Sequence, residues 1–291
     1  MLTRHLQNCF AKKGLYLRQV GVDSAGFSLF ELLVAVGLIA LSCMILFGVQ
    51  ADNVDRAAEA RFHTRAALLA QAQAARAAIE RHQPDRIVTL GGDCLVDLAP
   101  IAWLSRKYGD RLGVLWIDAH PDVMSAAEFS HAHAHVLAML LGRGDEDFTA
   151  EVDRKLTASR VMIAGMDAWT DAEGPILKEL GVRHTPSTDI AETSQPILDW
   201  IKSEGITHLA VHFDLDVLDP AHFSPLLFNR PGVPKGTFDG IVQGRMRLEQ
   251  VVRLLRDAGG AADMVGLAVT EFLPWDMLRL KDSLAGLPIM R

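Results

Sequence analysis

Short apolar runs without charges alternate with helix-forming segments through most of this chain, and this alternation limits the fold more than any other feature. The predicted strands are "DRIVTL" (85–90), "LGVLWI" (112–117), "ASRVMIAG" (158–165), the weaker "GVRHT" (181–185), "THLAVHF" (207–213) and "DMVGLAV" (263–269). Strands that alternate with helices indicate an α/β protein with a mainly parallel sheet. Because the apolar runs do not themselves alternate with polar residues, helices should cover both faces of that sheet.

Polar residues cluster directly after four of these strands. The clusters are "GGDC" (91–94), "DAHPD" (118–122), "DLDVLD" (214–219) and "TEF" (270–272), which contains Glu271. The carboxyl ends of parallel strands lie along one edge of the sheet, and ligands bind there. We therefore expect the four clusters to converge on one site.

Three aspartates, Asp214, Asp216 and Asp219, fall within a few residues at the end of one predicted strand. Two unit charges about 4 Å apart repel by roughly 4 kcal/mol at an effective dielectric near 20. A cation, a basic partner or exposure to water must offset that repulsion. Asp219 precedes Pro220 and is predicted to cap a turn, so we do not count it among the ligands.

A second cluster supports the cation. Asp118, His120 and Asp122 are spaced at i, i+2 and i+4, so in extended backbone they share one side, and Asp214 and Asp216 repeat that spacing. Carboxylates and imidazole suit Mn²⁺, Fe²⁺ or Zn²⁺. Four aspartates and one histidine exceed what a single catalytic metal needs, which favours two ions that share carboxylates.

Each motif taken alone has a simpler interpretation. A DxD pair at a strand end is often a turn former or a helix cap. The glycines of "GGD" could form only a tight turn, and "HAHAH" (131–135) could be a surface tract without a function. The occurrence of such motifs at four strand ends favours a shared metal site.

The composition argues against one class of partner and favours one kind of compartment. The net charge of the 291 residues is −7, so no basic footprint predicts binding to nucleic acid. The three cysteines, Cys9, Cys43 and Cys94, are scattered and form no disulfide framework. That pattern fits a reducing compartment.

The blocks "GGDC", "DAHPD", "FDLDVLDP" and "TEFLP", in this order and spacing, resemble the signature blocks of the ureohydrolases, the arginase and agmatinase group, over roughly residues 57–291. The resemblance implies a three-layer α/β/α domain with a mainly parallel sheet and a site for two divalent metal ions, Mn²⁺ above all, at the carboxyl ends of the strands. It implies a homo-oligomer that hydrolyses a C–N bond of a small cationic guanidino or amidino substrate and releases urea or an amide product.

The same resemblance assigns the metal ligands. Asp118 and Asp214 would bridge the two ions. His120 and Asp216 would complete one metal position, and Asp122 the other. The full predicted set is Cys94, Asp118, His120, Asp122, Asp214 and Asp216.

The remaining assignments concern chemistry. Glu271 matches the acid that holds the guanidinium group, and His135, 17 residues after Asp118, matches a histidine that shuttles protons. His131 and His133 are the alternatives for this role. Asp122 is expected to accept a proton during the reaction. Cys94 stands where the family usually has a histidine ligand, and a thiolate favours zinc or iron over manganese. The alternative is that Cys94 only lines the site as a small neutral residue.

Two stretches depart from the family pattern and leave alternatives open. Arginases carry Asn and Ser side chains after the DAHxD block that hold the amino-acid end of their substrate, whereas this chain reads "HAHAH", and residues 221–246 are longer than expected. The substrate therefore stays open. A single-metal deacylase of related fold and a degenerate, non-catalytic domain are the alternative functions. Two, one or no metal ions per chain would separate the three.

The first 56 residues differ in character from the rest, and we expect the catalytic domain to comprise residues 57–291. Residues 32–49 form a stretch of 18 residues without a charge. That length is at the lower limit for a membrane-spanning helix. "GFSLFELLVAVGLIALS" (26–42) resembles a type IV prepilin leader, with Gly26, Phe27 and Glu31 in the leader pattern.

The expected hydrophobic helix 27–49 has three interpretations: a leader, a fusion or misplaced start, or a segment packed on the sheet edge. We expect a cytoplasmic protein. Membrane association through 27–49, which would anchor the chain in an inner membrane, is the alternative.

Overall fold

The computed structural model describes residues 59–60 and 62–277 of the chain. The chain divides into two compact units, Met1–His63 and Thr64–Arg291, and the elements below belong to the second. The predicted hydrophobic helix 27–49, the prepilin-like leader and the boundary after residue 56 lie outside the described residues. In the described part of the chain, no helix combines the length and the apolar character needed to cross a membrane.

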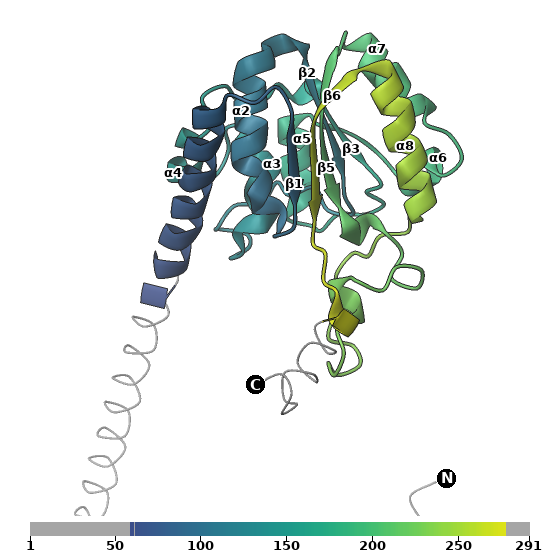
Figure 1. Cartoon of the computed structure of the whole chain (residues 1–291). Helices are drawn as coiled ribbons and strands as arrows, with labels where there is room; N and C mark the ends of the chain where they lie inside the picture. Colours follow the sequence, from purple (N-terminus) through teal and green to yellow (C-terminus); the bar gives the residue numbers. More distant parts are fainter. Residues whose placement is uncertain (1–58, 61, 278–291) are drawn as a thin grey trace, which may run out of the picture. The chain divides into compact units, whose positions relative to one another are not determined.

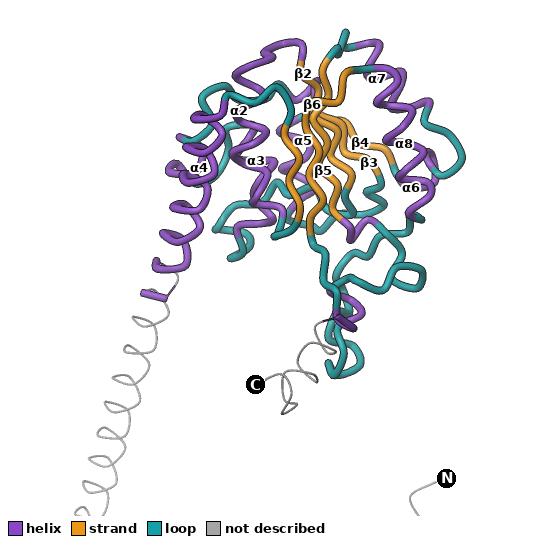
Figure 2. Tube along the Cα trace, viewed as in Figure 1, coloured by secondary structure: helices purple, strands orange, loops and turns teal. Residues whose placement is uncertain are grey.

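Six strands form one sheet in the order β1-β6-β5-β2-β3-β4, and all the paired strands are parallel (Figures 1 and 2). Their bounds are β1 Ile87–Leu90, β2 Leu112–Ile117, β3 Val161–Ala164, β4 Arg183–Thr185, β5 His208–Asp214 and β6 Asp263–Thr270. Each strand falls within or beside one of the predicted apolar runs. The predicted mainly parallel α/β sheet is confirmed.

Helices occupy the connections between these strands. Residues 64–82 are helical and precede β1. The later α-helices are α2 Leu98–Tyr108, α3 Val136–Leu140, α4 Glu146–Ala150, α5 Glu173–Leu180, α6 Ser187–Ile190, α7 Gln195–Ser203 and α8 Leu248–Ala261. Three short 3-10 turns matter for the site: η1 Cys94–Asp97, η3 Ala132–His135 and η5 Leu215–Val217.

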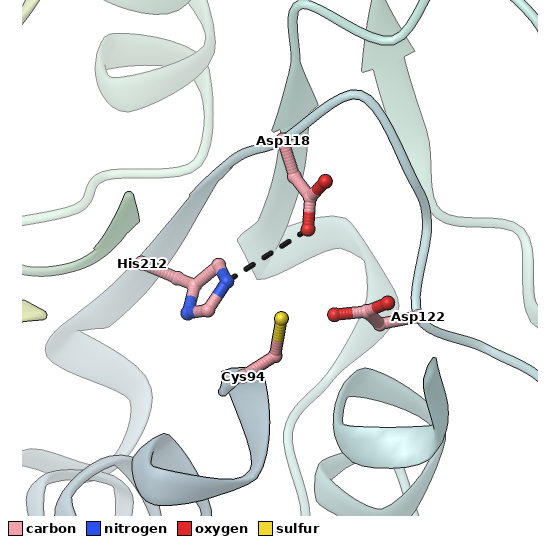
Figure 3. Close-up of side chains that lie close together, drawn as sticks. All are labelled: Cys94, Asp118, Asp122 and His212. Atoms are coloured by element: carbon pink, nitrogen blue, oxygen red, sulfur yellow. Dashed lines mark ion pairs between the residues drawn. The ribbon is translucent and has the colours of Figure 1, made fainter. Parts of the chain in front are cut away.

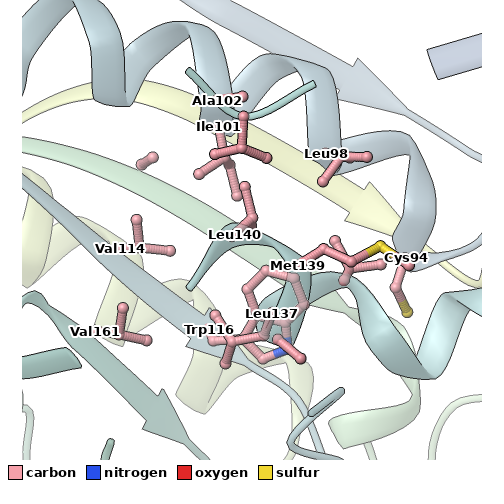
Figure 4. Packing of buried hydrophobic residues seen from close by; sticks show 14 of the residues in the cluster. Cys94, Leu98, Ile101, Ala102, Val114, Trp116, Leu137, Met139, Leu140 and Val161 are labelled. Carbon is pink, nitrogen blue, oxygen red and sulfur yellow. The ribbon is translucent and has the colours of Figure 1, made fainter. Parts of the chain in front are cut away.

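Two hydrophobic cores, one on each face of the sheet, give the domain its three layers. Successive side chains of a strand point to opposite faces, so Val114 and Trp116 of β2 belong to the core with α2, α3 and α5, part of which is seen in Figure 4. Leu115 and Ile117 of the same strand belong to the core with α6, α7 and α8. Burying such a side chain fully stabilises the fold by about 1.5–3 kcal/mol. The predicted three-layer arrangement follows from this pattern.

Candidate metal centre

Four strand ends meet at one edge of the sheet and bring the predicted ligands together. β1, β6, β5 and β2 are consecutive neighbours that run in the same direction. Their register pairs Leu90 with Val269, and Phe213 with both Val269 and Ile117. The polar clusters follow directly after these four residues, so the parallel register aligns them in one row.

The "GGDC" block is a tight turn that positions Cys94. Gly91 and Gly92 have φ angles of 86° and 81°, in the left-handed region that glycine tolerates without strain. A Cβ atom on Gly92 would lie 2.5 Å from a methyl carbon of Val96. Asp93 then caps η1 by accepting a backbone N–H of that turn at 3.0 Å. The glycine turn therefore leads directly into η1, and Cys94, the first residue of η1, is buried.

The first group of ligand atoms comes from four buried side chains (Figure 3). Its atoms lie within 4.8 Å of one another, and the residues are Cys94, Asp118, Asp122 and His212. Two donors hold Asp118 in place. Its Oδ1 accepts the backbone N–H of His120 at 2.7 Å, and its Oδ2 accepts the indole N–H of Trp116 at 3.1 Å.

Two further groups adjoin the first. They are Asp118 with His120 and Asp216, and Cys94 with Asp214 and Glu271. His120 Nδ1 lies 3.0 Å from Asp216 Oδ2 and 3.5 Å from Asp118 Oδ1. The Cys94 thiol donates to Asp214 Oδ2 at 3.0 Å. Because Asp118 and Cys94 each belong to two groups, the three groups form one continuous site.

The site holds more acidic groups than its own positive charge can balance. Burial first, and the charge of Asp216 second, raise the pKa of Asp214 to about 7. Burial and the charge of Asp214 raise the pKa of Glu271 to about 8. Burial also raises the pKa of Asp122 and of the Cys94 thiol. Each shift favours the neutral form, so the side chains by themselves lack positive charge.

Buried atoms without partners show that the residues fit metal ions. Oδ2 of Asp122, Oδ1 of Asp216 and Nε2 of His212 are buried and have no hydrogen-bond partner among the described residues. Leaving a buried polar atom unpaired costs about 1–3 kcal/mol. Carboxylate oxygen, imidazole nitrogen and thiolate sulfur are ligands of divalent transition metals. Two such ions would satisfy these atoms and supply the missing charge.

Two of the acids sit on strained backbone. Asp122 has a φ angle of 49° and Glu271 one of 59°. A left-handed conformation at a residue other than glycine costs of order 1–3 kcal/mol, and such residues gather at functional sites. The backbone N–H of Glu271 donates to the Gly92 carbonyl at 3.0 Å, which ties the end of β6 to the "GGDC" turn.

Comparison with known proteins assigns the family. The model of the arginase family matches residues 44–277, which is most of the chain. This chain belongs to the arginase family.

Arginases are also the relatives found by similarity. The arginase of Entamoeba histolytica is 23% identical over 213 residues, covering 70% of this chain and 66% of that protein. The arginase of Bacillus subtilis is 28% identical over 181 residues, covering 59% of this chain and 57% of that protein. The chain spans about half to two thirds of the length of these and other curated arginases.

Solved arginase structures confirm the fold. The Entamoeba histolytica arginase in complex with L-ornithine matches with a TM-score of 0.58 and 20% identity, covering 76% of this chain and 75% of that one. The Bacillus caldovelox arginase matches with a TM-score of 0.58 and 22% identity, covering 72% and 67%. Similarity at this level of identity establishes the α/β architecture.

Members of the arginase family normally bind two metal ions, and this chain gathers potential ligands for them. The structure brings the whole predicted ligand set into the continuous site, together with Glu271: Cys94, Asp118, His120, Asp122, Asp214 and Asp216. Asp219 stays outside it. As predicted, Asp219 caps a turn, with its Oδ1 accepting the backbone N–H of Ala221 at 2.8 Å.

The three histidines of "HAHAH" face different surroundings. His135 is buried, and its Nε2 lies 2.8 Å from the Phe129 carbonyl oxygen, outside the three ligand groups. Burial lowers the pKa of His135, and Glu128 is the first charge that acts against this. Burial also lowers the pKa of His133, but there the opposing charge is that of Asp93 in the "GGDC" turn. Of His133 and His135, His133 is therefore the one on which a charge of the "GGDC" turn acts.

Sequence reasoning missed His212 and Asp97. His212 lies inside β5 and is fully buried, and its Nδ1 is 2.8 Å from Asp97 Oδ2. A histidine within an otherwise apolar strand was the available signal in "LAVHF". Asp97 is the last residue of η1 and directly precedes α2. An aspartate at the start of a helix is common, so the sequence did not mark Asp97 as part of the site.

Proposed function

We propose that this chain is a binuclear metal hydrolase that cleaves a C–N bond of a small cationic guanidino or amidino compound. The observation that carries the proposal is the continuous site of three ligand groups at the carboxyl ends of four strands. One metal ion needs fewer carboxylates than this site offers. The excess favours two adjacent ions over one, and so favours a hydrolase of this kind over a single-metal deacylase.

The ligands divide into two sets that share bridging carboxylates. Cys94 and Asp122 would belong to one ion and His120 and Asp216 to the other, and Asp118 and Asp214 would be shared between them. The second set is rich in oxygen and suits Mn²⁺. When bound, two divalent ions lower the pKa of water from about 16 toward 7 and so supply hydroxide as the nucleophile at neutral pH.

Two acidic side chains, Asp122 and Glu271, would accept the proton and bind the substrate. Asp122 would take up a proton, and the support is the position of its buried carboxylate within the first ligand group. Glu271 directly follows β6 in a half-buried position and shares a ligand group with Asp214. A carboxylate binds a guanidinium or amidinium ion through charge-assisted hydrogen bonds, which are about twice as strong as neutral ones. Glu271 would orient such a substrate toward the ligand groups.

We further propose that His133, rather than His135, protonates the leaving amine. Its coupling to Asp93 supports this, as does the separate engagement of the His135 ring with the Phe129 carbonyl. We expect His133→Ala to lower turnover by about 10²- to 10⁴-fold, the usual contribution of a general acid or base. Metal content should remain at the wild-type value in the same variant.

His135→Ala and His131→Ala are the matched comparisons, since both alter the same tract. We expect each to keep turnover within about tenfold of wild type, well below the loss expected for a general acid. Steady-state rates and metal analysis of the three variants, measured side by side, decide the point. A greater loss in His135→Ala than in His133→Ala would return the role to His135.

A substrate screen tests the proposed function directly. Full-length protein with added Mn²⁺ is offered a panel of guanidino and formimino compounds, including L-arginine and agmatine, and urea, amine and amide products are assayed. Metal analysis of the same preparation accompanies the screen. Two ions per chain with turnover of one compound support the hydrolase. One ion per chain supports the single-metal deacylase, and no bound metal supports a degenerate domain.

We propose a cytoplasmic location for this enzyme. The support is the pattern of the three cysteines, which favours a reducing compartment. Among them, Cys94 is a free, buried thiol. Cell fractionation of the full-length chain is the test. Recovery in the membrane pellet, with protease reaching the domain only from the outer side, would overturn the proposal.

A further inference from the structure

The ring of His212 is positioned as a metal ligand usually is. His212 of β5 pairs in register with Trp116 of β2, and the two rings stack with centroids 3.7 Å apart at an angle of 13°. The ring is fully buried. Its Nδ1 lies 2.8 Å from Asp97 Oδ2, whereas its Nε2 has no hydrogen-bond partner in the described part of the chain.

The hydrogen bond to Asp97 decides which nitrogen carries the proton. A carboxylate only accepts, so Nδ1 of His212 must donate to it, and in the neutral ring Nε2 then has a free lone pair. The nearest acidic oxygen to Nε2 is Asp118 Oδ2 at 3.8 Å. That oxygen is itself an acceptor and already receives the Trp116 indole N–H at 3.1 Å. Two facing acceptors in a buried site call for a cation between them.

A charged ring explains these contacts less well. A doubly protonated His212 would bridge Asp97 and Asp118, but 3.8 Å exceeds the length of a hydrogen bond. It would also leave Oδ2 of Asp122, which belongs to the same group, without a partner. A metal ion satisfies both atoms at once.

We propose that Nε2 of His212 is a metal ligand that completes, with Cys94, Asp118 and Asp122, a four-ligand position, and that Asp97 is the residue that orients the ring. This inference rests on the proposed function, because it concerns the same metal centre. A carboxylate that holds the second nitrogen of a ligating histidine is the usual way in which proteins fix its tautomer and orientation.

The donor set also predicts which metal binds there. A thiolate, an imidazole and two carboxylates form the kind of mixed set that binds zinc, and thiolate favours zinc or iron over manganese. The neighbouring group of Asp118, His120 and Asp216 has no sulfur. The centre should therefore hold two different metals, with the thiophilic ion beside Cys94.

Cobalt provides the test, because Co²⁺ bound to a thiolate absorbs in the near ultraviolet. Full-length protein is stripped with a chelator and titrated with Co²⁺. We expect two ions per wild-type chain and a thiolate band that reports the Cys94 position. In His212→Asn the amide can still donate to Asp97, but no atom takes the place of Nε2. Affinity at the thiolate-reporting position should fall by more than the roughly 10- to 100-fold that loss of an orienting partner produces.

His208→Asn is the matched control. His208 begins the same strand and stacks on Tyr108 with centroids 4.3 Å apart, but it belongs to none of the ligand groups. Its cobalt titration should be that of wild type. An unchanged thiolate band and affinity in His212→Asn would overturn the inference.

Two more variants distinguish failure of the His212 inference from failure of the proposed function. Asp97→Asn retains the ring and its stacking, so it carries the test if His212→Asn does not fold, and we expect a roughly 10- to 100-fold weaker thiolate-reporting position. Wild-type affinity in Asp97→Asn would then overturn the inference. If Asp216→Asn weakens cobalt binding while His212→Asn does not, the inference fails and the proposed function stands. Wild-type protein that binds no cobalt would contradict both.

Discussion

Replacing Asp214 with Asn is expected to remove most of the bound metal and essentially all turnover. Asp214 ends β5, where its Oδ1 accepts the backbone N–H of Asp216 at 2.7 Å and its Oδ2 accepts the Cys94 thiol at 3.0 Å. The amide keeps the shape but removes the negative charge and one oxygen that the two ions would share. Metal analysis of the purified variant and steady-state assays on the substrate found by the screen measure the effect.

Asp219→Asn is the matched control, five residues along the same segment. Asp219 accepts a backbone N–H through Oδ1, which an amide oxygen also does, and it lies outside every ligand group. Its metal content and rate should stay at wild-type values. If Asp214→Asn also kept both, the ligand assignment for β5 would be wrong.

Asp214→Asn should also stabilise the metal-free protein at neutral and alkaline pH. Folding raises the pKa of Asp214 from 3.8 to about 7, so the ionised carboxylate destabilises the folded state. Stability is therefore lost as pH rises from about 4 to about 7. Asparagine cannot ionise. Metal-free Asp214→Asn should unfold at a higher temperature than metal-free wild type above pH 7, and the two should converge near pH 4.

Glu271→Gln is expected to lower kcat/KM while the metals stay bound. The change keeps the side-chain shape but removes the charge that would face a cationic substrate. Truncating one partner of a buried charge pair costs about 2–5 kcal/mol, or roughly 30- to 5,000-fold in rate. Assays on the identified substrate and metal analysis of the same sample separate the two effects.

Glu249→Gln provides the control for Glu271. Glu249 is an exposed acid in the first turn of α8, so the substitution changes the net charge equally without touching the site. We expect wild-type kinetics from it. Loss of metal from Glu271→Gln would instead identify Glu271 as a ligand, which its membership of a group with Cys94 and Asp214 makes a real alternative.

Much of the architecture could be predicted from local patterns. Apolar runs, the helices between them and the parallel direction are encoded within short windows, so the strand ends and their polar clusters follow from the sequence. Asp118, His120 and Asp122 needed only their alternate spacing to be placed together. These predictions depend on contacts that are local or that a parallel sheet imposes.

The parts that could not be predicted depend on long-range packing. His212 becomes a candidate ligand only when Trp116 stacks on it from the neighbouring strand and Asp97 fixes its tautomer from η1. The choice between His133 and His135 depends on contacts with distant segments, since Asp93 acts on His133 whereas the His135 ring contacts the Phe129 carbonyl. No periodicity in "HAHAH" distinguishes the two.

The left-handed backbone of Asp122 and Glu271 has a consequence for how this protein can change by mutation. Both are among the few described non-glycine residues with positive φ. Asparagine and glycine relax that conformation, because they are the residues that populate it most readily. Asp122→Asn or Glu271→Gly would therefore increase the stability of the folded chain and remove a carboxylate from the site. Without selection for turnover, mutation should therefore replace these two acids early, leaving an arginase-like fold without its complete metal site.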